Sequence, residues 1–191
     1  MHHHWEIKPK RIKKDDAILV VVDIQERLVP AMREGEKVVT QAAKAIRGFR
    51  ALGAPVLVTQ QYTKGLGETV EAVRDAFDGD FSHIEKSAFS AMAEPNFRDA
   101  LAKMGRKTVL LLGIEAHVCV LQTALDLREA GYEVFLVTDA ISSRKELDEV
   151  PGVQRMTHSR VLPTTVESAL FELLDNDSKS DTFKTISKLI K

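Results

Sequence analysis

Cys119 is the only cysteine in the chain, and it lies just after an apolar segment at residues 108–112 that is typical of a β-strand. A tight turn begins at Gly113, and a helical pattern follows from about His117 to residue 130. The first backbone N–H groups of a helix lack partners and its N-terminus is partly positive, so a thiolate is stabilised there and the pKa of the cysteine falls. This pattern predicts a reactive thiol, although a small buried hydrophobic residue is the competing interpretation.

Two further charged residues stand where strands are expected to end. Asp23 directly follows residues 17–22, a continuous apolar and mostly β-branched run that is typical of a strand buried on both faces. Its carboxylate either caps the next segment or points into a cleft at the carboxyl edge of the sheet. Lys86 follows an expected short strand at 81–85, and small and apolar residues come after it at 87–92. This context indicates a partly enclosed ammonium, whereas an ordinary exposed lysine is the alternative.

The elements that must position these residues alternate between strands and helices. This alternation predicts an α/β fold, a doubly wound, Rossmann-like parallel sheet of about six strands with helices on both faces. The expected strands lie at residues 17–22, 55–59, 81–85, 107–112, 133–138 and 160–162. The expected helices lie at about 29–52, 68–77, 95–104 and 117–130, then from a cap at Thr164 or Thr165 to Leu174, and finally at 182–190.

The expected topology brings the acid and the thiol together. In the common doubly wound order the first and fourth strands are neighbours, and the chain reverses direction between them. That reversal opens a crevice at the carboxyl ends of the strands, where ligands bind in such folds. Asp23 ends the first strand and Cys119 follows the fourth, so two groups far apart in sequence are expected to meet in this crevice.

Composition excludes several classes of function. The formal net charge is −1 at pH 7, with 44% hydrophobic and 29% charged residues, which gives no basic footprint for nucleic acid. The longest apolar run, residues 17–22, is too short to span a bilayer, and the N-terminus lacks the apolar core of a signal peptide. One cysteine permits no intrachain disulfide and suits a reducing compartment, so we expect a cytoplasmic protein.

One domain is expected between two short extensions. Residues 1–14 read as a flexible leader, in which the histidines of residues 1–4 are a possible tag remnant. The domain covers residues 15–175, and residues 176–191 form a C-terminal helical extension after a polar hinge.

Three separated segments, in order and with similar spacing, resemble the isochorismatase-like cysteine hydrolases, whose members include nicotinamidases and N-carbamoyl amide hydrolases. These segments are residues 22–26, 86–92 and 113–124, and the resemblance extends from about residue 17 to residue 174. The sequence Asp-Ile-Gln-Glu-Arg after the first strand, together with residues 141–144 and 183–190, is most similar to the isochorismatase-domain-containing subgroup. The domain is thereby identified as an isochorismatase-like hydrolase domain.

The resemblance implies a catalytic triad of Asp23, Lys86 and Cys119. Asp23 would accept the thiol proton and later return it to the leaving group, while Lys86 keeps the carboxylate ionised and favours the thiolate. Cys119 would attack an acyl or imidoyl carbon and form a thioester-type intermediate that water resolves. The family also carries a cis peptide at the position of Ile114 and Glu115. The resemblance also implies an oxyanion hole made by the backbone N–H groups of Glu115 and Cys119.

The departures from the family pattern concern cofactors. Metal-dependent nicotinamidases carry an Asp-X-His pattern after the second strand, but here the positions hold Gln61 and Thr63. Neutral amide and hydroxyl groups make a poor transition-metal site, so we expect no metal. The Gly-Leu-Gly at 65–67 lacks a third glycine and does not immediately follow a strand, so we expect no dinucleotide and no other cofactor.

The candidates for the substrate pocket come from the loops around the triad. Core packing is an alternative role for the tyrosine, phenylalanine and methionine among them, and a surface position is the alternative for the histidine. The candidates are Gln61, Tyr62, Phe89, Met92 and His117.

The leading hypothesis is a metal-independent cysteine hydrolase that cleaves a C–N bond of a small amide or carbamoyl substrate. One alternative is a vinyl-ether hydrolase like the isochorismatases, and another is a non-catalytic, oligomeric metabolite-binding protein. The expected partner is a small molecule, with no nucleic acid and no membrane. The family resemblance also implies a homo-oligomer, and the amphipathic helix at 182–190 is the candidate contact.

Overall fold

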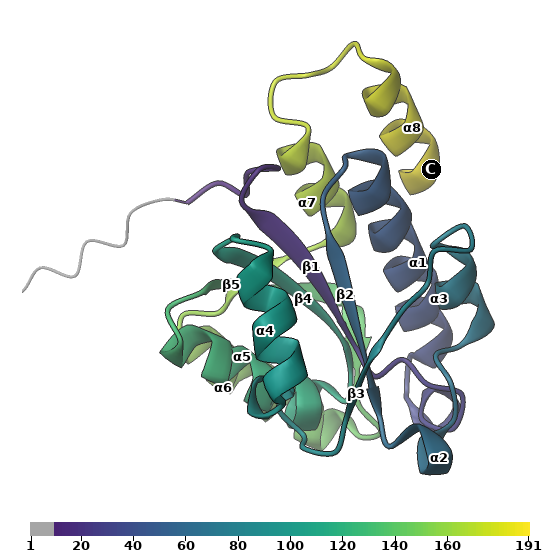
Figure 1. The fold of residues 1–191 in the computed structure, drawn as a ribbon, viewed down its shortest axis with the longest axis vertical. Helices are drawn as coiled ribbons and strands as arrows, with labels where there is room; N and C mark the ends of the chain where they lie inside the picture. The colour runs from purple at the N-terminus through teal and green to yellow at the C-terminus, as the bar shows by residue number, and fades with distance from the viewer. Residues whose placement is uncertain (1–9) are drawn as a thin grey trace, which may run out of the picture.

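The computed structural model describes residues 10–191, so the possible tag remnant lies outside the described residues. Six parallel strands form one sheet in the order β3-β2-β1-β4-β5-β6, which confirms the predicted fold class (Figure 1). The strands are β1 (Ala17–Val22), β2 (Val56–Gln61), β3 (Ile84–Lys86), β4 (Thr108–Ile114), β5 (Glu133–Ser142) and β6 (Leu162–Thr164).

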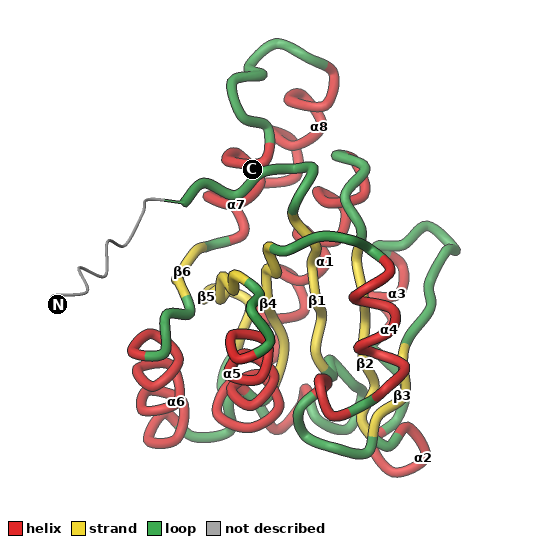
Figure 2. Tube along the Cα trace, turned by 60° about the vertical axis from the view of Figure 1, so that its left-hand side comes forward, coloured by secondary structure: helices red, strands yellow, loops and turns green. Residues whose placement is uncertain are grey.

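Helices cover both faces of the sheet (Figures 1 and 2). Side chains from α1, α3, α7 and α8 join one hydrophobic core, and side chains from α4, α5 and α6 join a second core on the opposite face. The helices are α1 (Gly35–Ala51), α2 (Thr63–Leu66), α3 (Glu71–Asp75), α4 (Pro95–Lys103), α5 (Leu121–Glu129), α6 (Glu146–His158), α7 (Val166–Leu173) and α8 (Asp181–Ile190). Short turns of other helix types are η1 (Val29–Ala31), η2 (Ala91–Ala93) and η3 (Ala116–Val120), of which η3 is a π-helix.

The central strand β1 explains why this topology forms. All six of its residues are fully buried, since both faces of the strand are covered by helices and both edges are paired. Val22 pairs in register with Thr59 of β2 and with Gly113 of β4. The first and fourth strands are therefore neighbours, as predicted, and their carboxyl ends lie at the same edge of the sheet.

The structure differs from the sequence-based prediction in the loops and in one helix. We assigned no element to residues 145–159, but α6 occupies this segment and contains Pro151 inside it. The expected helix at 68–77 is present as the shorter α3, and a further short helix that was not predicted, α2, precedes it. Strand β5 continues to Ser142, four residues further than predicted, because its last residues pair with the end of β4.

Both ends of the described chain pack against the domain. The leader was predicted to be flexible through residue 14, but Ile12 is buried in the core and its N–H donates to Glu172 Oε1 at 2.6 Å. Helix α8 places Ile186 fully inside the core that α1 also lines. The other apolar side chains of α8 are only partly buried, so the role of this helix in contacting a second copy stays a prediction. The division of the chain at residues 175 and 176 stays a prediction.

None of the helices formed by residues 10–191 has both the length and the apolar character needed to cross a bilayer.

Gly113 allows β4 to approach β1 where the two strands end. Its φ is +126°, and a Cβ atom at this position would lie 2.1 Å from the carbonyl oxygen of Val22. Backbone atoms of a central strand have little room to retreat, so this position accepts no side chain.

We therefore expect Gly113→Ala to lower the free energy of unfolding by about 3 kcal/mol, measured by urea denaturation. The control is Gly105→Ala, which has a φ of +63° but would meet no atom within 4 Å, so it should cost only about 1 kcal/mol. Equal losses in the two variants would show that the close approach at Gly113 is unimportant.

Candidate active site

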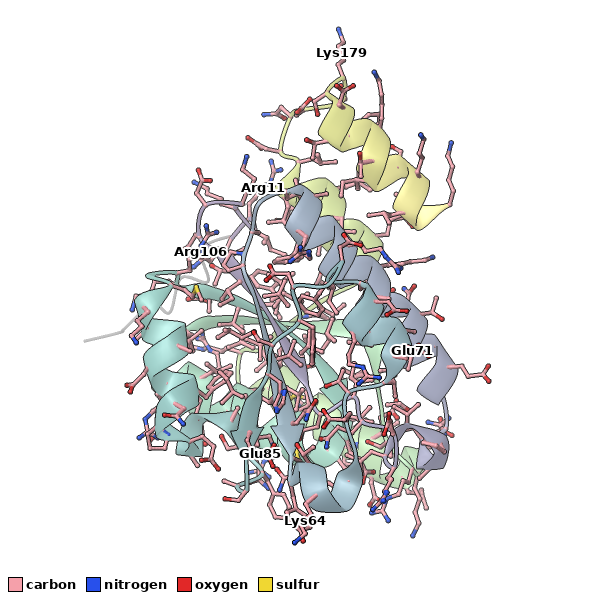
Figure 3. All side chains as sticks on the ribbon, turned by 45° about the vertical axis from the view of Figure 1, so that its right-hand side comes forward. Arg11, Lys64, Glu71, Glu85, Arg106 and Lys179 are labelled. Carbon is pink, nitrogen blue, oxygen red and sulfur yellow. The ribbon has the colours of Figure 1, made fainter. Side chains whose placement is uncertain are left out.

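Three strand ends bring the predicted charged residues and the thiol together. Asp23 follows β1, Lys86 is the last residue of β3, and Cys119 lies in η3 directly after β4. Asp23 has a φ of +52°, and its N–H bonds to the carbonyl of Thr59 at 3.2 Å, so the chain turns sharply at the strand end. In Figure 3, Glu85 of β3 and Lys64 of α2 mark this end of the molecule, and Arg11 lies toward the other end.

The Asp23 and Lys86 side chains form a fully buried ion pair. Asp23 Oδ2 lies 2.8 Å from Lys86 Nζ, and both side chains are 0% exposed. Thr59 Oγ1 donates to the other carboxylate oxygen, Asp23 Oδ1, at 2.8 Å. The interpretation of Lys86 as a partly enclosed ammonium is supported, and the alternative of an exposed lysine is wrong.

The thiol of Cys119 is covered, and its pKa differs from our prediction. Only 8% of the residue is exposed. Burial, followed by the negative charge of Asp23, raises the pKa of Cys119 to about 12, and the smaller influence of Lys86 does not compensate. The predicted lowering of this pKa is therefore wrong, because a helix terminus stabilises a thiolate less than removal from water destabilises it.

The carboxyl group of Asp23 is affected in the same direction. Burial raises its pKa, while Lys86, Thr59 and Cys119 oppose the change. Lys86 was expected to keep Asp23 ionised, but desolvation is the larger influence. A carboxylate with a raised pKa is a stronger proton acceptor, which suits an acid and base role beside a thiol.

The turn that carries Cys119 is held from two sides. The peptide bond between Ile114 and Glu115 is cis, at the position implied by the family resemblance. On the side of α6, a Cβ atom at Gly152 would lie 2.9 Å from the Cβ atom of His117, so the unpredicted helix packs closely on η3. His117 Nδ1 lies 2.8 Å from Ser143 Oγ, which ties η3 to the segment after β5.

The Glu115 side chain binds Arg144, so its carboxylate is not available for a catalytic role. Its two carboxylate oxygens accept from the Arg144 backbone N–H at 3.1 Å and from Arg144 Nε at 3.0 Å. The His117 ring lies 3.9 Å from the same carboxylate. The sequence did not single out Arg144 or Ser143 as site residues, although both lie in a segment that carries the family resemblance.

The predicted pocket residues divide into three groups. Tyr62 and Phe89 are 57% and 55% exposed, so core packing is the wrong interpretation for both. Met92 is half-buried and packs against the core on the side of Cys119. His117 is bound to Ser143, and Gln61 is bound to Lys86, so both are occupied by protein contacts.

Gln25 is a buried residue of the site region that sequence reasoning missed. Its Oε1 accepts from the Gln61 N–H at 2.7 Å, and its Nε2 donates to the carbonyl oxygens of Gln61 and Gly67 at 2.9 and 2.8 Å. These bonds connect the loop after β1 to the end of β2. Gln25 lies inside the matched segment 22–26, but a single sequence holds no sign of its partners.

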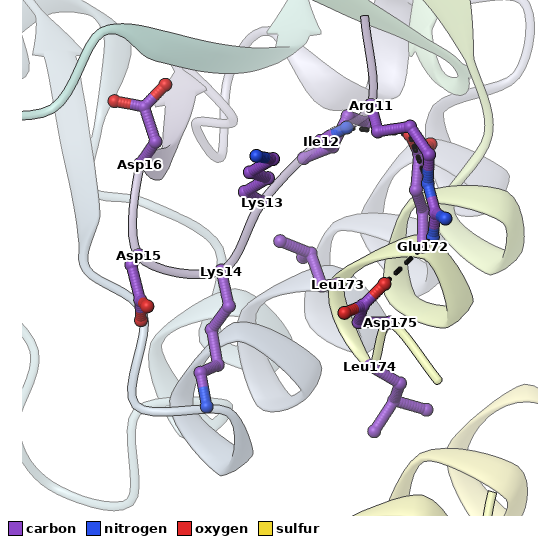
Figure 4. A pocket seen from close by; sticks show the side chains of 10 residues that line it. All are labelled: Arg11, Ile12, Lys13, Lys14, Asp15, Asp16, Glu172, Leu173, Leu174 and Asp175. Carbon is purple, nitrogen blue, oxygen red and sulfur yellow. Dashed lines mark hydrogen bonds and ion pairs between the residues drawn. The ribbon is translucent and has the colours of Figure 1, made fainter. Parts of the chain in front are cut away.

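A cavity of about 560 Å³ lies at the opposite end of β1 from Asp23 (Figure 4). Both acidic and basic side chains line it, and Arg11 pairs there with Glu172 and Asp175. It contains none of the predicted site residues. Its lining comprises Arg11, Ile12, Lys13, Lys14, Asp15, Asp16, Glu172, Leu173, Leu174 and Asp175.

Comparison with known proteins gives a consistent result. The family model of the isochorismatase domain matches residues 17–168. The chain is 39% identical over 170 residues to isochorismatase domain-containing protein 1 of Salmo salar, covering 88% of this chain and 59% of the salmon protein. The chain therefore spans about three fifths of the length of that relative.

Two solved structures are similar over almost the whole chain. The MAR1 ribonuclease of Caenorhabditis elegans has a TM-score of 0.88 and 36% identity, covering 95% of this chain and 92% of the nematode chain. The YcaC gene product of Escherichia coli, an octameric hydrolase of unknown specificity, has a TM-score of 0.87 and 26% identity, with the same coverage of 95% and 92%.

The raised pKa of Cys119 predicts slow alkylation. The reactive thiolate exists above the pKa, so a value of about 12 leaves about one thiol in ten thousand ionised at pH 8. We expect the rate of iodoacetamide labelling of the native protein to rise without a plateau from about pH 6 to about pH 10. Labelling in denaturant is the control, where an ordinary cysteine pKa of about 8.5 should give a plateau. A plateau below pH 8 in the native protein would contradict the prediction.

Proposed function

Because the chain belongs to the isochorismatase domain family, we propose that it is a hydrolase that cleaves a C–N bond of a small amide or carbamoyl compound, with Cys119 as the nucleophile. One observation carries the proposal. A thiol with little access to water lies beside a carboxyl group whose pKa is raised, and that carboxyl group is paired with a buried ammonium. Such a group of three is costly for folding and is useful for moving a proton.

The proposed reaction begins with a proton transfer from Cys119 to Asp23. The S–H bond breaks, an O–H bond forms on the carboxylate, and the electron pair stays on sulfur. The transfer removes the negative charge that disfavours the thiolate, while Lys86 remains positive beside it. The thiolate then attacks the substrate carbonyl carbon, and Asp23 gives its proton to the leaving nitrogen. In the second half of the reaction water attacks the thioester carbon while Asp23 accepts a proton from it. The C–S bond breaks, the acid product leaves, and Asp23 returns the proton to the sulfur of Cys119.

The backbone N–H groups of Glu115 and Cys119 are proposed to stabilise the negative oxygen of the tetrahedral intermediates. Each donor of this kind contributes about 3 kcal/mol in enzymes that use them. The side chain of Glu115 is not required for this role, since it is bound to Arg144.

The proposed reaction uses no metal and no cofactor. The two residues that stand where metal-dependent relatives carry ligands already have protein partners. Gln61 bonds to Lys86, and the Thr63 hydroxyl group bonds to Glu85 and accepts from Gln60. A metal ion at this position would have to displace these contacts with neutral donors in place of carboxylate and imidazole.

The protein is also proposed to form a homo-oligomer, since the Escherichia coli relative is an octamer. A cytoplasmic location stays a prediction that depends on the single cysteine. Light scattering of the full chain measures the assembly directly, and a mass equal to that of one chain would contradict self-association.

Replacement of the nucleophile tests the reaction. We expect Cys119→Ala to lower the release of ammonia or amine from the amide that the wild type turns over best by about a thousandfold or more. The wild type, mixed with that amide and quenched rapidly, should carry the mass of one acyl group on Cys119. The control is Met104→Ala at the exposed C-terminal end of α4, which should keep full turnover.

Other outcomes distinguish the remaining functions. Full turnover of a vinyl ether by Cys119→Ala would favour an isochorismatase-type reaction without covalent catalysis. An unchanged protein mass and no released amine across an amide library would favour a metabolite-binding protein. An RNA oligomer belongs in the same screen because the nematode relative is called a ribonuclease. We expect it to remain intact, since a net charge of −1 offers little attraction for a polyanion.

A further inference from the structure

The ammonium of Lys86 has more oxygen neighbours than it has hydrogen atoms. Gln61 Oε1 lies at 2.6 Å from Nζ, Phe89 O at 2.9 Å and Ala88 O at 3.0 Å, and all three accept hydrogen bonds. Asp23 Oδ2 is the fourth neighbour, at 2.8 Å. A lysine ammonium has only three N–H donors, so one of the four oxygens must do without.

The oxygen left without a donor is Asp23 Oδ2. Among the buried side-chain nitrogen and oxygen atoms of residues 10–191, it is the one that has no hydrogen-bond partner. Buried polar atoms are almost always paired, so an unpaired carboxylate oxygen in a catalytic crevice calls for a functional explanation. The Lys86 ammonium lies beside it as an ion-pair partner at 2.8 Å, with its N–H groups directed to the other three oxygens.

We propose that Gln61 is a positioning residue whose amide takes one N–H of Lys86, so that Asp23 Oδ2 is left open to accept the proton of the Cys119 thiol. The inference rests on the proposed hydrolase function of this site. It assigns Gln61 a different role from the substrate contact expected from the sequence, because the amide is occupied by protein groups on both sides.

The Gln61 amide has only one orientation that satisfies its neighbours. Its Nε2 donates to the carbonyl of Ser87 at 2.9 Å, so its oxygen faces the ammonium. The Gln61 backbone is fixed in turn by Gln25, which bonds to both its N–H and its carbonyl group. A neutral acceptor is suitable here, since it orients Lys86 without cancelling the positive charge that the thiolate needs.

The segment that carries the two backbone acceptors of Lys86 is held by a separate contact. Glu94 Oε1 accepts from the N–H groups of Ser87 and Ala88 at 2.8 and 3.1 Å. The Lys86 charge also acts on Glu94. Backbone hydrogen bonds and, to a smaller extent, the Lys86 charge lower the pKa of Glu94. The groups that act on the pKa of Asp23 are Lys86, the hydroxyl of Thr59 and the thiol of Cys119.

Two substitutions of Gln61 should move the pKa of Asp23 in opposite directions. Gln61→Met keeps the length of the side chain and removes the acceptor, leaving three oxygens for three N–H groups. One N–H of Lys86 then turns to Asp23 Oδ2 and lowers the pKa of Asp23 by about one unit. Gln61→Glu adds a second carboxylate to the same ammonium, and the like charge raises the pKa of Asp23 by about one unit.

The titration of Asp23 is measured by carbon-13 NMR on the full chain labelled at the aspartate carboxyl groups, with Asp23→Asn to identify the signal. Gln41→Met is the matched control, because Gln41 bonds to Asp139 and to none of the three site groups, and it should leave the Asp23 midpoint unchanged. Opposite shifts in the two Gln61 variants support the proposal. An unchanged or raised midpoint in folded Gln61→Met overturns it, and if that variant does not fold, an unchanged or lowered midpoint in Gln61→Glu overturns it.

Turnover separates this inference from the proposed function. If the protein hydrolyses amides, Gln61→Met should lower kcat/KM by about tenfold and move the acid limb of its pH profile to lower pH, in parallel with the Asp23 midpoint. If the midpoints move as expected while neither the wild type nor any variant hydrolyses an amide, the hydrolase proposal fails and the role of Gln61 in orienting Lys86 stands.

Discussion

The ion pair between Asp23 and Lys86 is the constraint that organises this molecule. Two charges that are fully withdrawn from water cost several kcal/mol each, and their attraction repays this cost only when the geometry is good and further hydrogen bonds are made. Apolar residues of similar volume would serve the core at least as well. A role in a reactive site would explain why the pair is buried. The carbonyl groups and the amide around Lys86 supply the hydrogen bonds that a buried ammonium needs.

Burial of the pair also determines the state of the thiol. The low exposure that strengthens the electrostatic interactions of Asp23 and Lys86 disfavours a free thiolate at Cys119, and the carboxylate charge disfavours it further. In the proposed reaction the site rests as a thiol beside a carboxylate, and the thiolate forms only when the proton moves from Cys119 to Asp23. Before that transfer the neutral thiol would react slowly with other electrophiles.

The sequence predicted most of the fold because the strands are strongly marked. The apolar run of β1 and the strand, turn and cysteine after β4 are local patterns, and the doubly wound order then requires their ends to meet. Helix α6 was missed because Pro151 lies inside it and its apolar spacing is weak, although the acidic residues Glu146, Asp148 and Glu149 in its first turn are a typical helix start. Its place is determined by tertiary packing on η3.

The sequence predicted which side chains meet at this edge of the sheet, but it did not predict the pKa values that they have there. The types and positions of Asp23, Lys86 and Cys119 can be read from the sequence alone. The pKa of the thiol depends on how much protein lies above it and on the distance to a carboxylate from another strand, and neither quantity is written in local sequence. The same applies to Gln61, whose partner Lys86 lies 25 residues further along the chain.

Gly113 lets β4 approach β1 just before the turn that carries Cys119, and Gly152 lets α6 approach the turn itself, and at both positions even a methyl group would collide with neighbouring atoms. The backbone around the turn therefore has little room to change through small substitutions. A related protein that acquires a larger or differently shaped substrate has to remodel the rim instead, where Tyr62 and Phe89 stand exposed on loops. Among proteins of this fold, substitutions should therefore concentrate in those loops, and the residues around the turn should change little.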